Sequence, residues 1–131
     1  MPRATAAARI SKETDKETDM AEEKNYLVVF AAPVPGKEAA FQQWYDEVHV
    51  PDILGLPGYS AAQRFEFAAS HAGEPPQRFL AIYEVEGSIE AGKAAMAEGR
   101  AAGRIRMSDA LDPASVAGWW FRPLTERKTA E

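Results

Sequence analysis

The chain has 131 residues, of which 46% are hydrophobic and 27% are charged, a length and composition that predict one folded domain. The 20 acidic residues outnumber the 15 basic residues and no dense basic block occurs, which argues against nucleic acid and membrane surfaces as partners. The sequence has no cysteine, which excludes disulfides and thiolate-bound metals and is typical of a cytoplasmic protein, and it has no apolar run of the ~20 residues that span a bilayer.

The two ends of the chain differ in character from its centre. Residues 1–24 are polar, with interleaved charges and almost no large apolar side chains, so we expect a flexible N-terminal tail. Residues 125–131 form a short charged C-terminal tail. The domain is therefore expected over residues 25–124.

The first strand and the first helix are predicted close to the start of this domain. Residues 26–32 form a short apolar run that ends at Pro33, which is typical of a strand buried on both faces. Residues 37–49 carry a helical stripe made of Phe41, Trp44, Tyr45 and Val48. Proline 51 disfavours helical geometry in the residue before it, so we expect this helix to end near residue 49.

Three further elements follow. Residues 59–67 and 77–86 are rich in strand formers and predict an antiparallel pair joined by a longer polar loop. Ser88 is a helix cap for residues 88–102, a segment rich in alanine that Gly92 and Gly99 should weaken. Residues 115–124 contain a cluster of aromatic residues and predict the last strand.

The predicted order of elements is strand, helix, strand, strand, helix, strand. This βαββαβ order is the ferredoxin-like α+β fold, a four-stranded antiparallel sheet with both helices on one face. Apolar residues occupy both faces of the strands, so the helix-free face should also be covered. We expect a homodimer in which two such sheets enclose an apolar chamber for a small hydrophobic or aromatic ligand.

One segment carries a family resemblance. Residues 41–59 read FQQWYDEVHVPDILGLPGY and contain the pattern W-Y-x-x-x-H-x-P-x-x-L followed by P-G-Y. With residues 62–65 (AQRF) and 81–85 (AIYEV), this segment resembles the EthD-like group of the dimeric α+β barrel superfamily. The resemblance covers residues 26–123 and implies a ferredoxin-like domain that pairs as a dimeric α+β barrel. Members of the superfamily are assigned to isomerisation, cyclisation and oxygenation, so the reaction stays open.

His49 is the first candidate for chemistry. At the end of the predicted helix, the helix dipole would raise the pKa of the imidazole, whereas burial would lower it. We expect these opposing effects to place the pKa near neutrality, where an imidazole works best as a general acid or base. The alternative is that His49 only caps the last carbonyls of the helix. The resemblance favours the catalytic role, because the functional histidine of the group matches this position.

Two charged residues are candidates for supporting roles. Asp52 follows His49 closely and would orient the imidazole or contact the substrate, unless it only stabilises a turn. Arg64 lies in a predicted strand, on the same face as Ser60 and opposite Tyr59. The Arg64 guanidinium suits a carboxylate or an enolate of the substrate; alternatively it pairs with Glu66, Glu84 or Glu86.

Aromatic residues supply the remaining candidates. Tyr83 is a candidate catalytic residue that would stabilise an oxyanion through its hydroxyl group. Tyr45, Tyr59, Trp119 and Trp120 are candidate substrate contacts, and for each of them packing in the core or at the dimer interface is the alternative.

These residues predict a small cofactor-independent enzyme. His49 would remove a proton next to the carbonyl group of a hydrophobic cyclic or aromatic compound, as in an isomerase, cyclase or lyase of a catabolic or polyketide-like pathway. No cofactor and no metal site are expected, because the sequence lacks nucleotide and metal-binding motifs. The alternatives are a binding protein for a small hydrophobic ligand and an EthD-like or antibiotic-biosynthesis-type monooxygenase.

Overall fold

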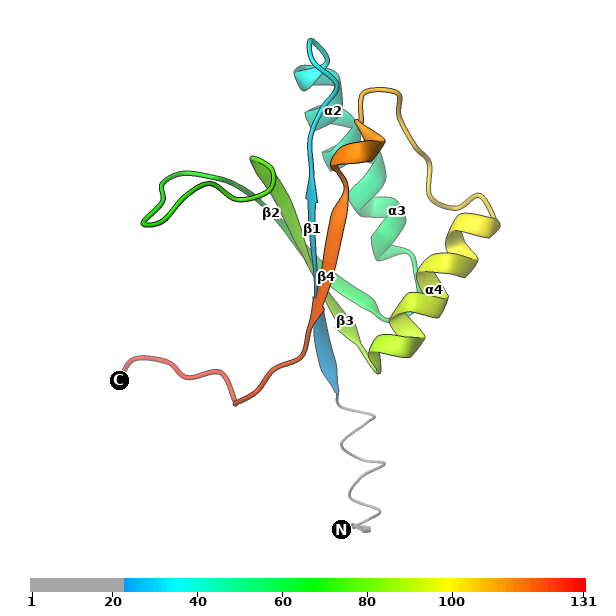
Figure 1. Cartoon of the computed structure of the whole chain (residues 1–131). Helices are drawn as coiled ribbons and strands as arrows, with labels where there is room; N and C mark the ends of the chain where they lie inside the picture. The colour runs from blue at the N-terminus through cyan, green and yellow to red at the C-terminus, as the bar shows by residue number, and fades with distance from the viewer. Residues whose placement is uncertain (1–22) are drawn as a thin grey trace.

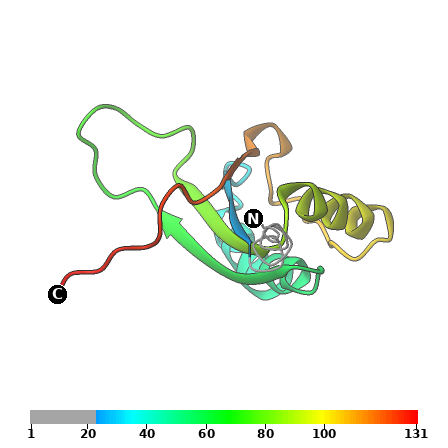
Figure 2. The ribbon, with the colours of Figure 1, turned by 90° about the horizontal axis from the view of Figure 1, so that it is seen from below.

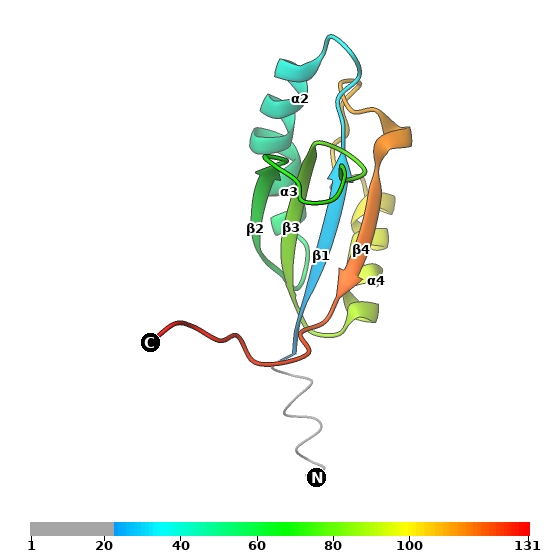
Figure 3. The same cartoon turned by 60° about the vertical axis from the view of Figure 1, so that its left-hand side comes forward.

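Four strands form one antiparallel sheet in the computed structural model, which describes residues 23–131. They are β1 (Lys24–Ala31), β2 (Tyr59–Glu66), β3 (Phe79–Glu86) and β4 (Ala117–Phe121), in the spatial order β2-β3-β1-β4. The helices lie on one face of this sheet (Figure 1), and Figure 3 shows the other face free of helices. The predicted ferredoxin-like α+β fold is thus confirmed. The N-terminal tail predicted over residues 1–24 lies outside the described residues, apart from its last two.

The first helix is longer than the sequence predicted. It runs through α2 (Glu38–Trp44), the π-helical turn η2 (Tyr45–His49) and α3 (Val50–Leu54) without a break. The N–H of Val50 donates to the carbonyl of Tyr45, five residues earlier, as in a π-helix. In a regular α-helix the ring of Pro51 would clash with the carbonyl four residues earlier. The wider turn removes this conflict, so the prediction that the helix ends at residue 49 was wrong.

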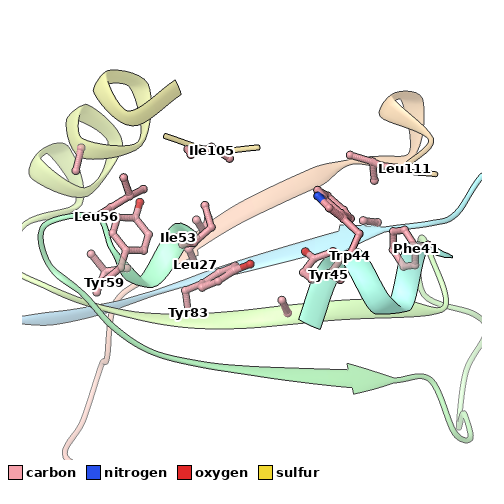
Figure 4. Close-up of a cluster of buried hydrophobic side chains, with 14 of the residues drawn as sticks. Leu27, Phe41, Trp44, Tyr45, Ile53, Leu56, Tyr59, Tyr83, Ile105 and Leu111 are labelled. Atoms are coloured by element: carbon pink, nitrogen blue, oxygen red, sulfur yellow. The ribbon is translucent and has the colours of Figure 1, made fainter. Parts of the chain in front are cut away.

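The helix face of the sheet forms the core. Alternate residues of β1 and β3 point toward the helices, among them Leu27, Ala81 and Tyr83. They pack against aromatic side chains of the first helix, and Figure 4 shows these rings between the sheet and the helices. The first helix therefore supplies most of the aromatic part of the core.

The second helix, α4 (Ile89–Ala101), packs unusually close to its neighbours. The Ser88 hydroxyl accepts a hydrogen bond from the N–H of Ala91, which confirms the predicted cap. A Cβ atom at Gly92 would lie 2.7 Å from Cη2 of Trp120, and one at Gly99 would lie 2.5 Å from Cδ2 of Leu56. The two glycines cost helix propensity but allow this close packing.

A β-bulge in β2 changes which side chains share a face. Tyr59 pairs with Val85, whereas Ala61 pairs with Glu84, so one extra residue lies between them. Tyr59 and Arg64 consequently lie on the same face of the sheet, not on opposite faces as strict alternation predicted.

The helix-free face is apolar and open. Phe65, Trp119 and Phe121 are 42%, 44% and 56% exposed, and they surround Val28 and Ile82. The loop between β2 and β3 and the chain after β4 extend away from the body of the fold (Figure 2). Among the described residues, no helix is long and apolar enough to cross a membrane.

Candidate functional site

A pocket of about 180 Å³ lies between the sheet and the helices. It brings together three predicted site residues, Tyr45, His49 and Tyr83. The rest of its lining is formed by Val29, Ala31, Trp44, Ile53, Met96, Arg100, Met107, Leu111, Pro113 and Val116.

The position of this pocket corrects one sequence-based expectation. The sequence predicted a ligand chamber between the sheets of two copies. Val29, Ala31 and Tyr83, which line the pocket, instead belong to the strand positions that face the helices of the same chain. The long first helix carries His49 over that face, so the histidine lies away from the open face of the sheet.

The His49 imidazole packs between two aromatic rings. Its ring centroid lies 4.7 Å from that of Trp44 at an interplanar angle of 31°, and 5.0 Å from that of Tyr45 at 79°. The π-helical turn explains this double contact, because it brings a residue five positions along the helix, as well as four, onto the same side. Nδ1 of His49 is buried and has no hydrogen-bond partner among the described residues.

Burial dominates the protonation of His49. It lowers the pKa of the imidazole from 6.5 to about 4, against the opposing effect of the Asp52 carboxylate, while the charges of Arg100 and Arg64 lower the pKa further. The expected value near neutrality was wrong because burial outweighs the opposing effect of the Asp52 carboxylate. The helix also continues for another turn beyond His49, so His49 is not at the helix end where the dipole would favour the cation. At pH 7 the imidazole is neutral and can accept a proton.

Two tyrosine hydroxyl groups lie beside the histidine. The Tyr83 side chain is almost completely buried, and its hydroxyl oxygen has no well-formed hydrogen bond within residues 23–131. The Tyr45 hydroxyl is its polar neighbour, and Figure 4 shows the two hydroxyl groups facing one another. Burial raises the pKa of both phenols, so both stay protonated and can donate a hydrogen bond to a ligand oxygen.

Arg64 lies outside the pocket. Its guanidinium donates to Asp46 at 2.8 Å and to Gln42 at 2.7 Å, and it stacks 4.3 Å above the Tyr45 ring. These contacts fasten β2 to the first helix. Two of its nitrogens are thus bound to the helix, whereas its buried Nε has no hydrogen-bond partner in residues 23–131, and the role of Arg64 toward a substrate stays a prediction.

Asp52 forms an ion pair with Arg106 outside the pocket. Its carboxylate accepts two hydrogen bonds from the Arg106 side chain, at 2.8 and 3.0 Å, and one from the Arg106 backbone at 2.9 Å. Nε1 of Trp44 donates to the carbonyl of Arg106 at 3.0 Å. Asp52 therefore positions the segment after α4 and makes no hydrogen bond to His49. Its negative charge still acts on the pKa of His49 through space.

The three remaining aromatic candidates do not line the pocket. Tyr59 is a core residue whose hydroxyl donates to the carbonyl of Gly92 at 2.8 Å. Trp120 packs against α4, whereas Trp119 lies on the open face with its ring edge against Phe30. Neighbouring strand residues point to opposite faces, which separates the two tryptophans.

Sequence reasoning missed most of the pocket wall. Trp44 was assigned only to the core, and the helix stripe was the signal that could have placed it next to His49. Arg100, Met107 and Val116 follow no sequence motif, because the fold brings them to the pocket from α4 and from the irregular segment after it. In residues 23–131, no group of three or more acidic or histidine side chains is placed to hold a metal ion.

Comparison with known proteins identifies the fold. No protein-family model matches the sequence, and no curated protein matches it either. An ethyl tert-butyl ether D (EthD) family protein from Bacillus halodurans C-125 is 20% identical, with a TM-score of 0.57 over 77% of this chain and 99% of that chain. An EthD-like protein from Ralstonia eutropha JMP134 is 16% identical, with a TM-score of 0.52 over 81% of this chain and 96% of that one.

A third solved structure, HapK from Hahella chejuensis, is 16% identical, with a TM-score of 0.50 over 82% of this chain and 99% of that chain. All three matches cover nearly the whole length of the known protein. The resemblance predicted from the sequence is thus confirmed at the level of architecture: this chain has the fold of the EthD-like proteins.

Proposed function

We propose that this protein is a small enzyme in which neutral His49 removes a proton from a hydrophobic cyclic or aromatic carbonyl compound. The observation that carries the proposal is a half-buried imidazole whose Nδ1 atom is buried without a hydrogen-bond partner in residues 23–131, in the same apolar pocket as the facing hydroxyl groups of Tyr83 and Tyr45. Buried polar atoms normally find partners, and those that do not are frequent at functional sites. A ligand oxygen or an acidic C–H group would supply the missing partners.

The size of the pocket limits the ligand. A cavity of ~150 Å³ in another protein accepts benzene, so a volume of about 180 Å³ fits one ring with a small substituent. The walls suit such a ring, since Trp44 and Tyr45 present aromatic surface, Ile53 presents apolar surface and Met96 presents a flexible apolar side chain. We therefore propose a single-ring ligand.

The proposed step moves one proton. The His49 imidazole takes a proton from the carbon next to the carbonyl group, and the C–H electron pair forms the enolate. The Tyr83 and Tyr45 hydroxyl groups donate hydrogen bonds to the enolate oxygen. Return of the proton to a different carbon atom gives an isomer, and loss of a neighbouring leaving group gives a lyase product. The step draws only on side chains of this chain.

Deuterium exchange tests this step without knowledge of the final product. The protein is incubated with acetophenone in deuterated water, and loss of the methyl proton signal is followed by NMR. We expect His49→Gln to lower the exchange rate by a factor of ~100 or more, the usual contribution of a general base. His71→Gln is the matched control, because His71 is exposed in the loop between β2 and β3. Equal rates for His49→Gln and the wild type would refute the proposal.

A second candidate function is oxygenation, as in the EthD-like or antibiotic-biosynthesis-type alternative. The similarity in fold to an ethyl tert-butyl ether D family protein supports the EthD-like part of this alternative. Here the same His49 would deprotonate a phenol hydroxyl or an acidic C–H group of the substrate. The resulting anion would then react with dioxygen. An oxygen electrode separates the two functions, since consumption of oxygen with a phenol supports the monooxygenase and exchange without consumption supports proton transfer alone.

The third alternative is a binding protein without turnover. It predicts that a single-ring ligand binds and is recovered unchanged, and that exchange in deuterated water is no faster than in buffer. The exchange experiment therefore also distinguishes catalysis from binding.

We also infer that two copies associate through the helix-free face of the sheet. The half-exposed rings of Phe65, Trp119 and Phe121 lie there beside Val28 and Ile82, as one apolar surface. Apolar patches of this kind on soluble proteins are usually covered by a partner. A second copy presents the same surface, and the two-fold pairing of two such faces would bury both.

A further inference from the structure

The pocket has one charged residue besides the titratable His49. Arg100 lines the pocket from the last turn of α4, among neighbours that are otherwise apolar or aromatic. It is exposed at the rim, and it makes no ion pair with an acidic side chain of residues 23–131. By contrast, Arg64 and Arg106 are both bound to aspartates.

The charge of Arg100 acts on the pocket electrostatically. The guanidinium is one of the charges that lower the pKa of His49, so it acts on the imidazole across the pocket. An arginine fork matches the two oxygens of a carboxylate, and such a pair is stronger next to an apolar wall than in open water. A ligand ring in the pocket would thus have a cation at its outer end.

We propose that Arg100 binds a carboxylate group of the ligand at the rim of the pocket, so that the substrate class is the single-ring carboxylic acids. This inference rests on the proposed function, because it concerns the ligand of the same pocket. The ring occupies the space next to Trp44 and Tyr83, and the carboxylate points toward α4 and solvent. A negative charge there also favours the protonated imidazole, and so makes His49 a stronger base when the ligand is bound.

The helix itself offers a structural explanation for Arg100. A cation in the last turn interacts favourably with the carbonyl end of the helix dipole. Such a residue would influence the stability of α4, but it would leave the choice between a charged and a neutral ligand unchanged. The charge preference of binding therefore separates the two roles.

The test compares benzoate with benzamide, which have nearly the same shape and differ in charge. Binding of each probe to the full-length protein is measured by NMR titration of the His49 imidazole signals. We expect benzoate to bind about tenfold more tightly than benzamide, as one charge-assisted pair would provide. The preference should fall to about twofold or less in Arg100→Gln, and it should fall in the wild type as salt is added.

Two variants serve as controls. Arg104→Gln removes a nearby exposed arginine that does not line the pocket, and it should keep the full preference for benzoate. Arg100→Lys retains the positive charge without the planar fork and should keep part of the preference. Thermal unfolding of each variant shows whether α4 remains folded.

Two results would overturn the proposal: equal affinity of the wild type for both probes, or an unchanged preference in Arg100→Gln. Neither result would refute the proposed function if proton exchange of acetophenone in deuterated water still depends on His49. Conversely, a preference for benzoate that depends on Arg100, together with exchange that does not depend on His49, would support an anion-binding pocket and refute the proton-transfer enzyme.

Discussion

The burial of His49 should make the stability of the fold depend on pH. The pKa of the imidazole falls from 6.5 to about 4 on folding, so between these values the unfolded chain binds a proton that the folded chain does not. Stability is therefore lost as the pH falls below about 6.5, and the loss levels off below about 4. Above pH 7 the histidine is neutral in both states and contributes no pH dependence.

The magnitude follows from the size of the shift. A shift of one pKa unit corresponds to ~1.4 kcal/mol, so the full change from 6.5 to about 4 corresponds to about 3 kcal/mol. Between pH 7.5 and pH 4.5 most of this difference develops, and we expect about 2 kcal/mol after allowing for the partial exposure of the side chain. This is a large share of the ~5–15 kcal/mol by which small domains are stable.

Urea unfolding at the two pH values measures this effect. The three tryptophans report unfolding through their fluorescence, and His49→Gln provides the reference in which the titrating group is absent. The wild type should lose about 2 kcal/mol more between pH 7.5 and 4.5 than His49→Gln does, since the carboxylate contributions common to both proteins cancel. His71→Gln should behave like the wild type.

A direct NMR titration completes the test, because the chain has only two histidines. The proposed burial of His49 would be refuted if its imidazole titrated with the ordinary pKa near 6.5. It would also be refuted if stability responded to pH equally with and without His49. The imidazole would then be solvated as a cation, and a neutral buried base would not exist in this protein.

Three further predictions concern the surroundings of the site. Gly99→Ala should destabilise the fold by about 1–3 kcal/mol in urea unfolding, because the added Cβ would meet Leu56 at 2.5 Å and overpacking outweighs the gain in helix propensity; an unchanged or raised stability would contradict the close packing of α4. Asp52→Asn should lower the melting temperature, since it breaks the paired hydrogen bonds with Arg106, yet change the affinity for benzoate less than about twofold. A large loss of affinity would instead indicate that Asp52 takes part in ligand binding. Trp119→Glu should shift the protein from dimer to monomer in analytical ultracentrifugation, because a charge would be buried at the inferred interface; an unchanged assembly would place the interface elsewhere.

We expect the pocket to be independent of that assembly. Its lining lies between β1 and β3 on one side and the helices on the other, on the face of the sheet opposite the inferred interface. A monomeric Trp119→Glu variant should therefore retain exchange activity that depends on His49. This separates the inference about the dimer from the proposal about the reaction.

The order of the elements and their faces were predictable from the sequence. Alternating apolar residues and a helical stripe are local patterns, because strand and helix periods are set by backbone geometry within a few residues. The same stripe placed Phe41 and Tyr45 in the core, and the W-Y-x-x-x-H-x-P pattern pointed to His49 as the functional residue.

Tertiary structure decided the rest. The π-helical turn before Pro51 extends the helix past His49, so burial, and not the helix dipole, governs the imidazole, and no local rule predicts that turn. The partners of Arg64 and Asp52 are 18 and 54 residues away in sequence, and these ion pairs hold both side chains outside the pocket lining. Arg100 reaches the pocket only because its helix packs across the sheet. Charged side chains pair with the groups that lie close to them in space, and the order of residues in the chain alone does not determine those distances.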